Sequence, residues 1–186
     1  LAHALKSLGI KRGDRVASFA LNDQRHLELY FGVPCYGAVL HTVNIRLSQE
    51  HLIYIINHAE DQVLFIDENV LFLIEPIKDK LKTVKHFVVL SQSGNKPQTS
   101  LSPVYLYDEL IAQFPTDYDF PSDLSEWDPA LICYTSATTG QPKGVVYTHR
   151  GIVLHSYGVG VTLGVSEADS VLHIVPMFHA NAWGAP

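Results

Sequence analysis

The sequence has little cysteine, little charge and no long apolar run. Its 186 residues include only Cys35 and Cys133, both in apolar surroundings, which argues against a disulfide framework and fits reduced core residues. Charged residues make up 17%, and a net charge of -6 provides no basic surface for nucleic acid, so we expect no nucleic-acid partner. Charge or proline breaks every apolar run well before the roughly 20 residues of a membrane span. These absences predict a cytoplasmic protein without a transmembrane segment.

Histidine is plentiful, but its spacing is not that of a metal site. The 10 histidines are scattered from His3 to His179, with no HExxH pattern and no accompanying pair of cysteines. Zinc sites are built from such closely spaced ligand pairs. We therefore expect no zinc site.

The composition favours one globular domain with a substantial core. Hydrophobic residues make up 47% of the chain, including 9 tyrosines and 8 phenylalanines, which argues against disorder. A chain of this length buries roughly two-thirds or more of the surface that its unfolded form exposes. An anionic ligand would have to be bound by local hydrogen-bond donors, because the overall charge is negative.

Short apolar strands alternate with helices along the first half of the sequence. We expect strands at 16–20, 38–43, 62–67 and 86–90, and helices at 1–8, 23–37, 48–59 and 69–81. Asp23 and Ser48 are typical helix N-caps, and Pro76 should kink or break the last of these helices. Nearly continuous apolar strands separated by helices are typical of a sheet buried on both faces. The predicted fold class is therefore α/β, a mostly parallel sheet with helices on both faces.

The second half of the sequence contains longer polar connections. Residues 91–103 are rich in Ser, Gly and Pro and predict a surface loop, followed by a short amphipathic helix at 105–114. An acidic, proline-bearing connection leads to a strand at 130–136. We expect a loop after that strand, then a helix at 149–163 and a last strand at 170–178.

The loop reads YTSATTGQPKG over residues 134–144 and combines five hydroxyl side chains, beginning with Tyr134, with two glycines and Lys143. Hydroxyl donors, a glycine free to adopt positive φ at Gly140 and a lysine charge are suited to binding phosphate. The order of residues is not that of a Walker A loop. GVGVTLG at 158–164 has one residue too many for the dinucleotide fingerprint and falls within a predicted helix. On composition alone, a phosphate-binding loop and an ordinary polar surface loop both remain open.

A family resemblance favours the first alternative. The stretch YTSATTGQPKGVVYTHRG resembles the signature loop of the AMP-forming adenylating enzymes, which include acyl-CoA synthetases, luciferases and peptide-synthetase adenylation domains. VPMFHANAWG is similar to the next motif of that family. GIKRGDRVA and YFGVPCYGAVLHTVNIRLSQEHLIYIINHAEDQVLFID resemble, in particular, its medium- and long-chain fatty acyl-CoA synthetases. The resemblance covers nearly the whole chain.

The resemblance implies roles for residues of both motifs. The loop residues implied to bind the nucleotide, chiefly its β- and γ-phosphates, are Thr135, Ser136, Ala137, Thr138, Thr139, Gly140 and Lys143, with the Thr135 hydroxyl also near Mg²⁺. Ala137 stands where the family usually has glycine, and a Cβ at positive φ would cost about 1 kcal/mol, which predicts a weaker grip on the nucleotide. His179 is implied beside the acyl carboxylate, as the catalytic candidate. Ala180 and Trp183 are implied near the nucleotide and the mouth of the acyl channel, although Trp183 packing in the core remains open.

The resemblance also implies a reaction. A fatty acid carboxylate attacks the α-phosphorus of ATP, pyrophosphate leaves, and the acyl-adenylate passes its acyl group to coenzyme A. Two alternatives stay open: an acyl- or aryl-AMP ligase that uses another acceptor, and a non-catalytic module that binds nucleotide or acyl groups. Family analogy is compatible with a homodimer and with peripheral association with a membrane.

By the same resemblance, residues 1–186 form part of the large N-terminal domain of an adenylate-forming enzyme, truncated at both ends. The C-terminal lid domain, with its catalytic lysine, has no counterpart here, and neither do the family's Tyr-Gly-x-Thr-Glu and Thr-Gly-Asp segments. We therefore expect residues 1–186 alone to be catalytically inactive.

Overall fold

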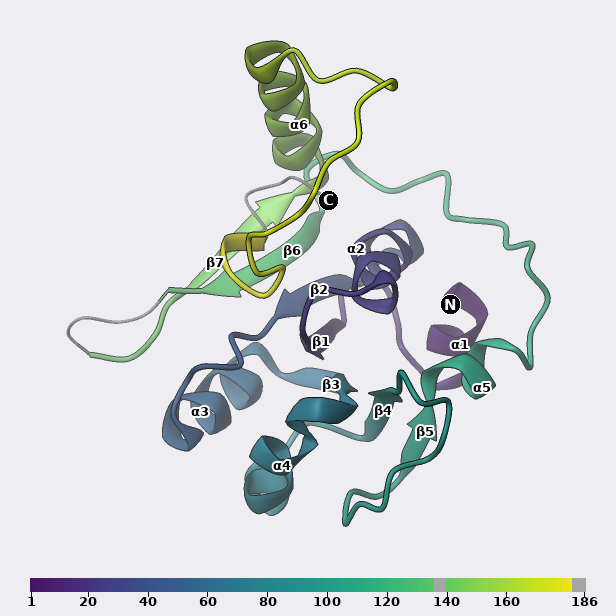
Figure 1. Ribbon diagram of the computed structural model, residues 1–186, viewed down its shortest axis with the longest axis vertical. Helices are drawn as coiled ribbons and strands as arrows, with labels where there is room; N and C mark the ends of the chain where they lie inside the picture. Colours follow the sequence, from purple (N-terminus) through teal and green to yellow (C-terminus); the bar gives the residue numbers. More distant parts are fainter. Residues whose placement is uncertain (136–139, 182–186) are drawn as a thin grey trace.

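A seven-stranded, mostly parallel sheet forms the centre of the protein, in a computed structural model that describes residues 1–135 and 140–181 (Figure 1). The strands are β1 (Arg15–Phe19), β2 (Val39–Thr42), β3 (Asp61–Asp67), β4 (His86–Leu90), β5 (Val104–Leu106), β6 (Pro129–Tyr134) and β7 (Gly144–Thr148). Their spatial order is β5-β4-β3-β1-β2-β6-β7, and β6–β7 is the one antiparallel pair among them. The predicted α/β class is confirmed.

Helices cover both faces of the sheet. Alternate side chains of each strand point to opposite sides, and apolar side chains on both sides are buried against helices. One core cluster joins the sheet to α1 (Ala2–Ser7), α2 (Gln24–Tyr36) and α5 (Tyr107–Ile111). The other cluster joins it to α3 (Gln49–Ala59), α4 (Leu71–Ile74) and the 3-10 segment η2 (Glu75–Lys80). Val16 of β1 belongs to the first cluster and its neighbour Ala17 to the second.

The two predicted helix N-caps and the predicted break at Pro76 are confirmed. The Asp23 side chain accepts a hydrogen bond of 2.7 Å from the backbone N–H of His26, and Ser48 accepts one of 3.3 Å from that of His51. Pro76 does interrupt the expected helix: four α-helical residues are flanked by the 3-10 segments η1 (Glu68–Val70) and η2. Its fixed φ and missing N–H explain this break.

Two strands of the sheet, β5 and β7, were not predicted from the sequence. Residues 105–114 are not one helix, because β5 occupies Val104–Leu106 before α5 begins at Tyr107. The loop after β6 leads into β7 and not directly into a helix, so α6 (His149–Leu163) begins only after that strand. The loop therefore connects two antiparallel strands, and the strand–loop–helix arrangement that the sequence suggested is wrong.

The predicted strand at 170–178 is also wrong. No ladder pairing is found for these residues within the described parts of the chain. A side chain satisfies their backbone instead: Nδ2 of Asn22 donates to the carbonyl oxygens of His173 at 3.2 Å and Val175 at 2.9 Å. Oδ1 of Asn22 accepts from the N–H of Met177 at 2.7 Å.

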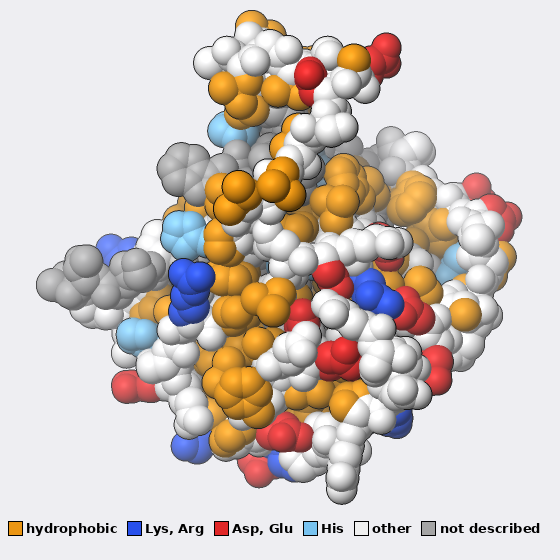
Figure 2. All heavy atoms as spheres, in the orientation of Figure 1, with side chains coloured by type: hydrophobic (Ala, Val, Ile, Leu, Met, Phe, Trp, Pro, Cys, Tyr) orange, Lys and Arg blue, Asp and Glu red, His pale blue; other side chains and the backbone are white. Residues whose placement is uncertain are grey.

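α6 has an exposed apolar surface, which Figure 2 shows at the top of the view. None of its residues is buried, and Val161 and Leu163 are 83% and 70% exposed. Across the described residues, no helix has both the length and the hydropathy required to cross a membrane.

Candidate functional site

The loop of residues 135–143 closes an antiparallel hairpin. Tyr134 is paired with Gly144 across β6 and β7, and the N–H of Thr135 donates to the carbonyl oxygen of Lys143 at 3.0 Å. Gly140 has a φ of +91°, the left-handed conformation expected for it. The hairpin therefore holds Thr135 and Lys143 opposite each other at the base of the loop.

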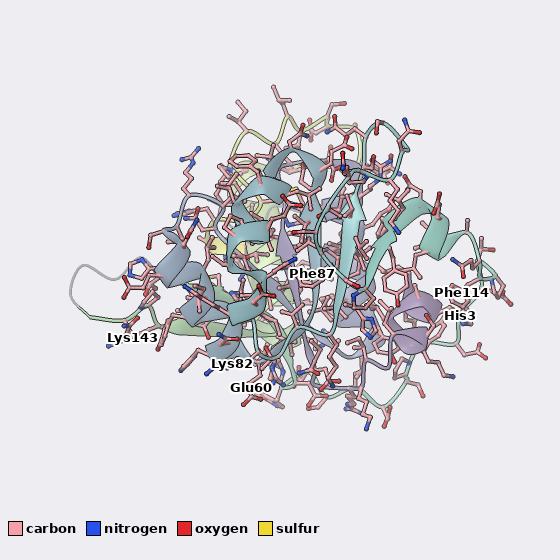
Figure 3. All side chains as sticks on the ribbon, turned by 90° about the horizontal axis from the view of Figure 1, so that it is seen from below. His3, Glu60, Lys82, Phe87, Phe114 and Lys143 are labelled. Atoms are coloured by element: carbon pink, nitrogen blue, oxygen red, sulfur yellow. The ribbon has the colours of Figure 1, made fainter. Side chains whose placement is uncertain are left out.

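The predicted loop residues that the structure describes are accessible to a ligand. Thr135, Gly140 and Lys143 are exposed, and Figure 3 shows Lys143 on the opposite side of the molecule from His3 and Phe114. Four further predicted residues of the loop, Ser136, Ala137, Thr138 and Thr139, lie outside the described residues, as does Trp183 of the second motif.

The second motif is fixed to the sheet by buried contacts. The Tyr30 hydroxyl on α2 donates to the carbonyl oxygen of Met177, and the Thr42 hydroxyl at the end of β2 donates to Oδ1 of Asn181 at 2.9 Å. Ala180 and Asn181 have φ angles of +47° and +48°, which are uncommon for residues other than glycine. Such strained positions cluster at functional sites.

Both motifs lie at the carboxyl ends of neighbouring strands. Thr42 is in register with Cys133 across β2 and β6, and Cys133 is two residues before Thr135. In open α/β sheets, ligands bind outside the carboxyl ends of the strands. The hydrogen bond from Thr42 to Asn181 thus brings the second motif to the edge of the sheet from which the loop emerges.

A mostly apolar cavity of about 520 Å³ lies against the β6–β7 hairpin, with Ala180 and Asn181 at this edge and Leu131 and Tyr147 toward the amino end of β6. It lies between α2, the β6–β7 hairpin, the start of α6 and the second motif, and its lining includes Leu131, Ile152 and Ala180. His149 and Asn181 also line it, and their Nε2 and Nδ2 atoms are buried without a hydrogen-bond partner among the described residues. Burial lowers the pKa of His149, which the nearby Asp128 opposes. An apolar cavity with a few unpaired polar atoms is typical of a small-molecule site.

His179, the predicted catalytic residue, is exposed and does not appear in the lining of this cavity, whereas its neighbour Ala180 does. Its backbone N–H donates to the carbonyl oxygen of Pro176 at 3.0 Å. Sequence reasoning missed His149 and Asn181. The position of Asn181 inside the second motif was a signal that could have identified it, whereas nothing in the sequence placed His149 at a cavity.

No group of three or more His, Cys, Asp or Glu residues in ranges 1–135 and 140–181 is placed to hold a metal ion. The exposed Thr135 offers an oxygen ligand, which is the donor type that Mg²⁺ prefers, and Mg²⁺ commonly takes its other ligands from water and substrate phosphates. The residues present fit a magnesium ion that arrives with a triphosphate.

The whole chain is similar in sequence to known acid-activating enzymes. Residues 1–185 match the family described as AMP-binding enzyme. The chain is 48% identical over its whole length to the long-chain-fatty-acid–CoA ligase of Thermus thermophilus, and 45% identical to the 3-methylmercaptopropionyl-CoA ligase of Ruegeria lacuscaerulensis. It spans 33% and 35% of these two relatives, about a third of their length.

Among solved structures, the fold is similar to that of the anthranilate CoA ligase AuaEII in complex with anthranoyl-AMP. The TM-score is 0.86 at 27% sequence identity, and the similarity covers 98% of this chain and 36% of that one.

Proposed function

Because the chain belongs to the AMP-binding enzyme family, we propose that it is part of an enzyme that activates a fatty acid with ATP and transfers the acyl group to coenzyme A. The observation that supports this most directly is the hydrogen bond from Thr42 to Asn181, which brings one end of the apolar cavity to the sheet edge from which the exposed Thr135–Lys143 loop emerges. A triphosphate and an alkyl chain have different chemistry, and the loop and the cavity offer a suitable surface to each.

In the first half-reaction, a carboxylate oxygen attacks the α-phosphorus of ATP, and the bond to the pyrophosphate oxygen breaks. Negative charge grows on the departing pyrophosphate, so fixed donors and a cation beside it stabilise the transition state. Lys143 supplies the charge, and the loop hydroxyls and backbone N–H groups supply the donors, including those of Ser136, Thr138 and Thr139. Mg²⁺ bound through the Thr135 hydroxyl and the phosphates would neutralise further charge.

In the proposed site, the acyl chain enters the apolar cavity. Ala180 and Asn181 form part of its wall, and Nδ2 of Asn181, which has no acceptor among the described residues, is proposed to bind the carboxylate. His179 is proposed beside the same carboxylate and Trp183 at the mouth of the channel. Burying the alkyl chain contributes about 0.8 kcal/mol per methylene, so the length of the cavity sets the preferred acid.

In the second half-reaction, the thiol sulfur of coenzyme A attacks the acyl carbonyl. AMP leaves, and the thiol proton is released to solvent or to a base. The choice of coenzyme A as acceptor is supported by the two relatives, both named CoA ligases. Their acids differ, so the fatty acid is proposed from the apolar lining of the cavity.

Carboxylate-dependent exchange of labelled pyrophosphate into ATP tests this function in the full-length protein. The panel runs from acetate to palmitate and includes 3-methylmercaptopropionate and aromatic acids. We expect exchange to peak with an aliphatic acid and thioester to form with coenzyme A. Exchange without thioester would favour a ligase with another acceptor, and MgATP binding without any exchange would favour a non-catalytic module.

A further inference from the structure

The side chain of Tyr134 is held from three sides at the base of the loop. Its hydroxyl lies 2.7 Å from Nδ1 of His58 on α3, and its ring centroid lies 5.0 Å from that of His41 on β2. The third contact is with Gly144, where a Cβ would lie 3.2 Å from Cζ of Tyr134. Tyr134 precedes Thr135 and Gly144 follows Lys143, so the ring packs where both arms of the loop leave the sheet.

His41 is itself held by a buried acid. Its Nδ1 lies 2.7 Å from Oδ2 of Asp61, and neither side chain has any exposed surface. Burial raises the pKa of Asp61, and the contact with His41 opposes this. The other polar atoms of the pair, Nε2 of His41 and Oδ1 of Asp61, have no partner among the described residues. The single shared hydrogen bond therefore fixes the orientation of the imidazole that faces Tyr134.

The hydroxyl of Tyr134 is engaged by α3 at 2.7 Å from Nδ1 of His58. Burial raises its pKa to about 12, so the phenol stays protonated and can donate to this nitrogen. The role of Tyr134 therefore differs from that of the hydroxyls that follow it in the loop.

We propose that Tyr134 is a positioning residue for the phosphate-binding loop, and that the His41–Asp61 pair acts through its ring. A short loop binds an anion more tightly when its ends are already ordered, because less conformational entropy is lost on binding. The ring sets the spacing of Thr135 and Lys143 before the triphosphate arrives. This inference rests on the proposed function, insofar as that function places a triphosphate at the loop.

Two variants of the full-length protein test the role of Tyr134 through the dissociation constant of MgATP, measured by titration calorimetry. Tyr134→Leu removes the ring and the hydroxyl, and we expect MgATP to bind at least about 10-fold more weakly, with the KM for the acid changed less than about twofold. Tyr134→Phe keeps the ring and loses one hydrogen bond, so a loss of about fivefold or less is expected.

Tyr105 and His86 provide a matched control at the opposite edge of the sheet. Their ring centroids are 5.8 Å apart at an interplanar angle of 53°, compared with 5.0 Å and 48° for Tyr134 and His41. Tyr105→Leu therefore removes the same side chain from a similar ring pair. We expect it to lower the melting temperature without changing the affinity for MgATP.

A double-mutant cycle tests whether His41 acts through Tyr134. His41→Asn keeps an N–H donor near the position of Nδ1 for Asp61 but removes the ring. We expect it to weaken MgATP binding in the wild-type background and to have no further effect in the Tyr134→Leu background. A merely structural role predicts instead that the losses in melting temperature add and that MgATP affinity does not change.

Either of two results would overturn the inference: MgATP affinity of Tyr134→Leu equal to that of Tyr105→Leu, or an undiminished effect of His41→Asn in the Tyr134→Leu background. If Tyr134→Leu does not fold, His41→Asn in the wild-type background decides, because an unchanged affinity for MgATP in that variant would also overturn the inference. Absence of carboxylate-dependent exchange in the wild type would contradict the proposed function alone. Direct MgATP binding still tests the positioning role in that case.

Discussion

The hydroxyl of Thr42 donates a hydrogen bond of 2.9 Å to Oδ1 of Asn181, 139 residues further along the chain. Both side chains are buried. Oδ1 of the amide accepts from Thr42, and the Nδ2 donor at its other end has no acceptor among the described residues. The end of β2 thus orients a hydrogen-bond donor in the second motif.

Thr42→Val in the full-length protein is expected to release this amide. The KM for the acid should rise about fivefold, because the Asn181 donor is no longer oriented, and the free energy of unfolding should fall by about 1 kcal/mol. The KM for MgATP should not change. Thr83→Val is the control, since Oγ1 of Thr83 is already without a partner among the described residues. Equal acid KM values for the two variants would contradict the role given to Asn181.

Lys143→Ala is expected to weaken MgATP binding at least about 10-fold through loss of a cation beside the phosphates. Its side chain is exposed, so the melting temperature should change little. Thr139→Ala should act in the same direction. Lys82→Ala, another exposed lysine, controls for net charge and should bind MgATP like the wild type. A large loss of stability with normal kinetics would instead indicate a structural role for Lys143.

His26 predicts a pH dependence of stability. Its Nδ1 lies 3.0 Å from the carbonyl oxygen of Leu21, which can only accept, so Nε2 is left to accept from the hydroxyl of Ser18 at 3.0 Å. Burial lowers the pKa of His26 from 6.5 to about 4. Between these values the unfolded chain binds a proton that the folded chain does not, so stability decreases as the pH falls through this window.

The contribution of His26 should be fully present above pH 6.5 and should be lost by about pH 4, amounting to roughly 3 kcal/mol. Urea unfolding at a series of pH values measures it. His26→Gln is expected to reduce the change in the free energy of unfolding with pH between pH 4 and 6.5. If this change with pH is the same in the variant, His26 has the same pKa in the folded and unfolded states.

Residues 1–186 produced alone are expected to self-associate through the exposed apolar surface of α6. Val161 and Leu163 are 83% and 70% exposed there, and patches of this kind favour association. Val161→Glu together with Leu163→Glu should shift the sedimentation profile toward monomer. Thr162→Glu adds charge on the same helix without removing apolar surface. A similar shift with this control would identify net charge as the cause.

The first half of the fold could be predicted because local signals and tertiary packing agree there. Asp23, Ser48 and Pro76 each act on their own helix, and the apolar strands between them are buried on both faces. The second half depends on partners far away in sequence. β7 has only five residues and was read as part of the loop, whereas pairing with β6 makes it a strand.

Residues 170–178, in contrast, were predicted to form a strand and do not. Their composition is that of a strand, but the carbonyl and N–H groups of residues 173–177 are satisfied by the amide of Asn22. A single asparagine 151 residues away gives no signal in a local window. The loop was predicted to bind phosphate from its resemblance to a family motif, with the hydroxyl of Tyr134 counted among its five hydroxyl side chains. Only the structure shows that the Tyr134 hydroxyl points to His58.

The strand order allows most of the sheet to fold while the rest of the chain is still being synthesised. β5, β4, β3, β1 and β2 form one contiguous block of the sheet, built from the first 111 residues, and the β6–β7 hairpin joins that block only at β2. During translation the block can fold before the hairpin has left the ribosome. Until then β2, with four buried residues, is an open apolar edge that can pair with other chains. Placing the loop between β6 and β7 and closing this edge are therefore the same event.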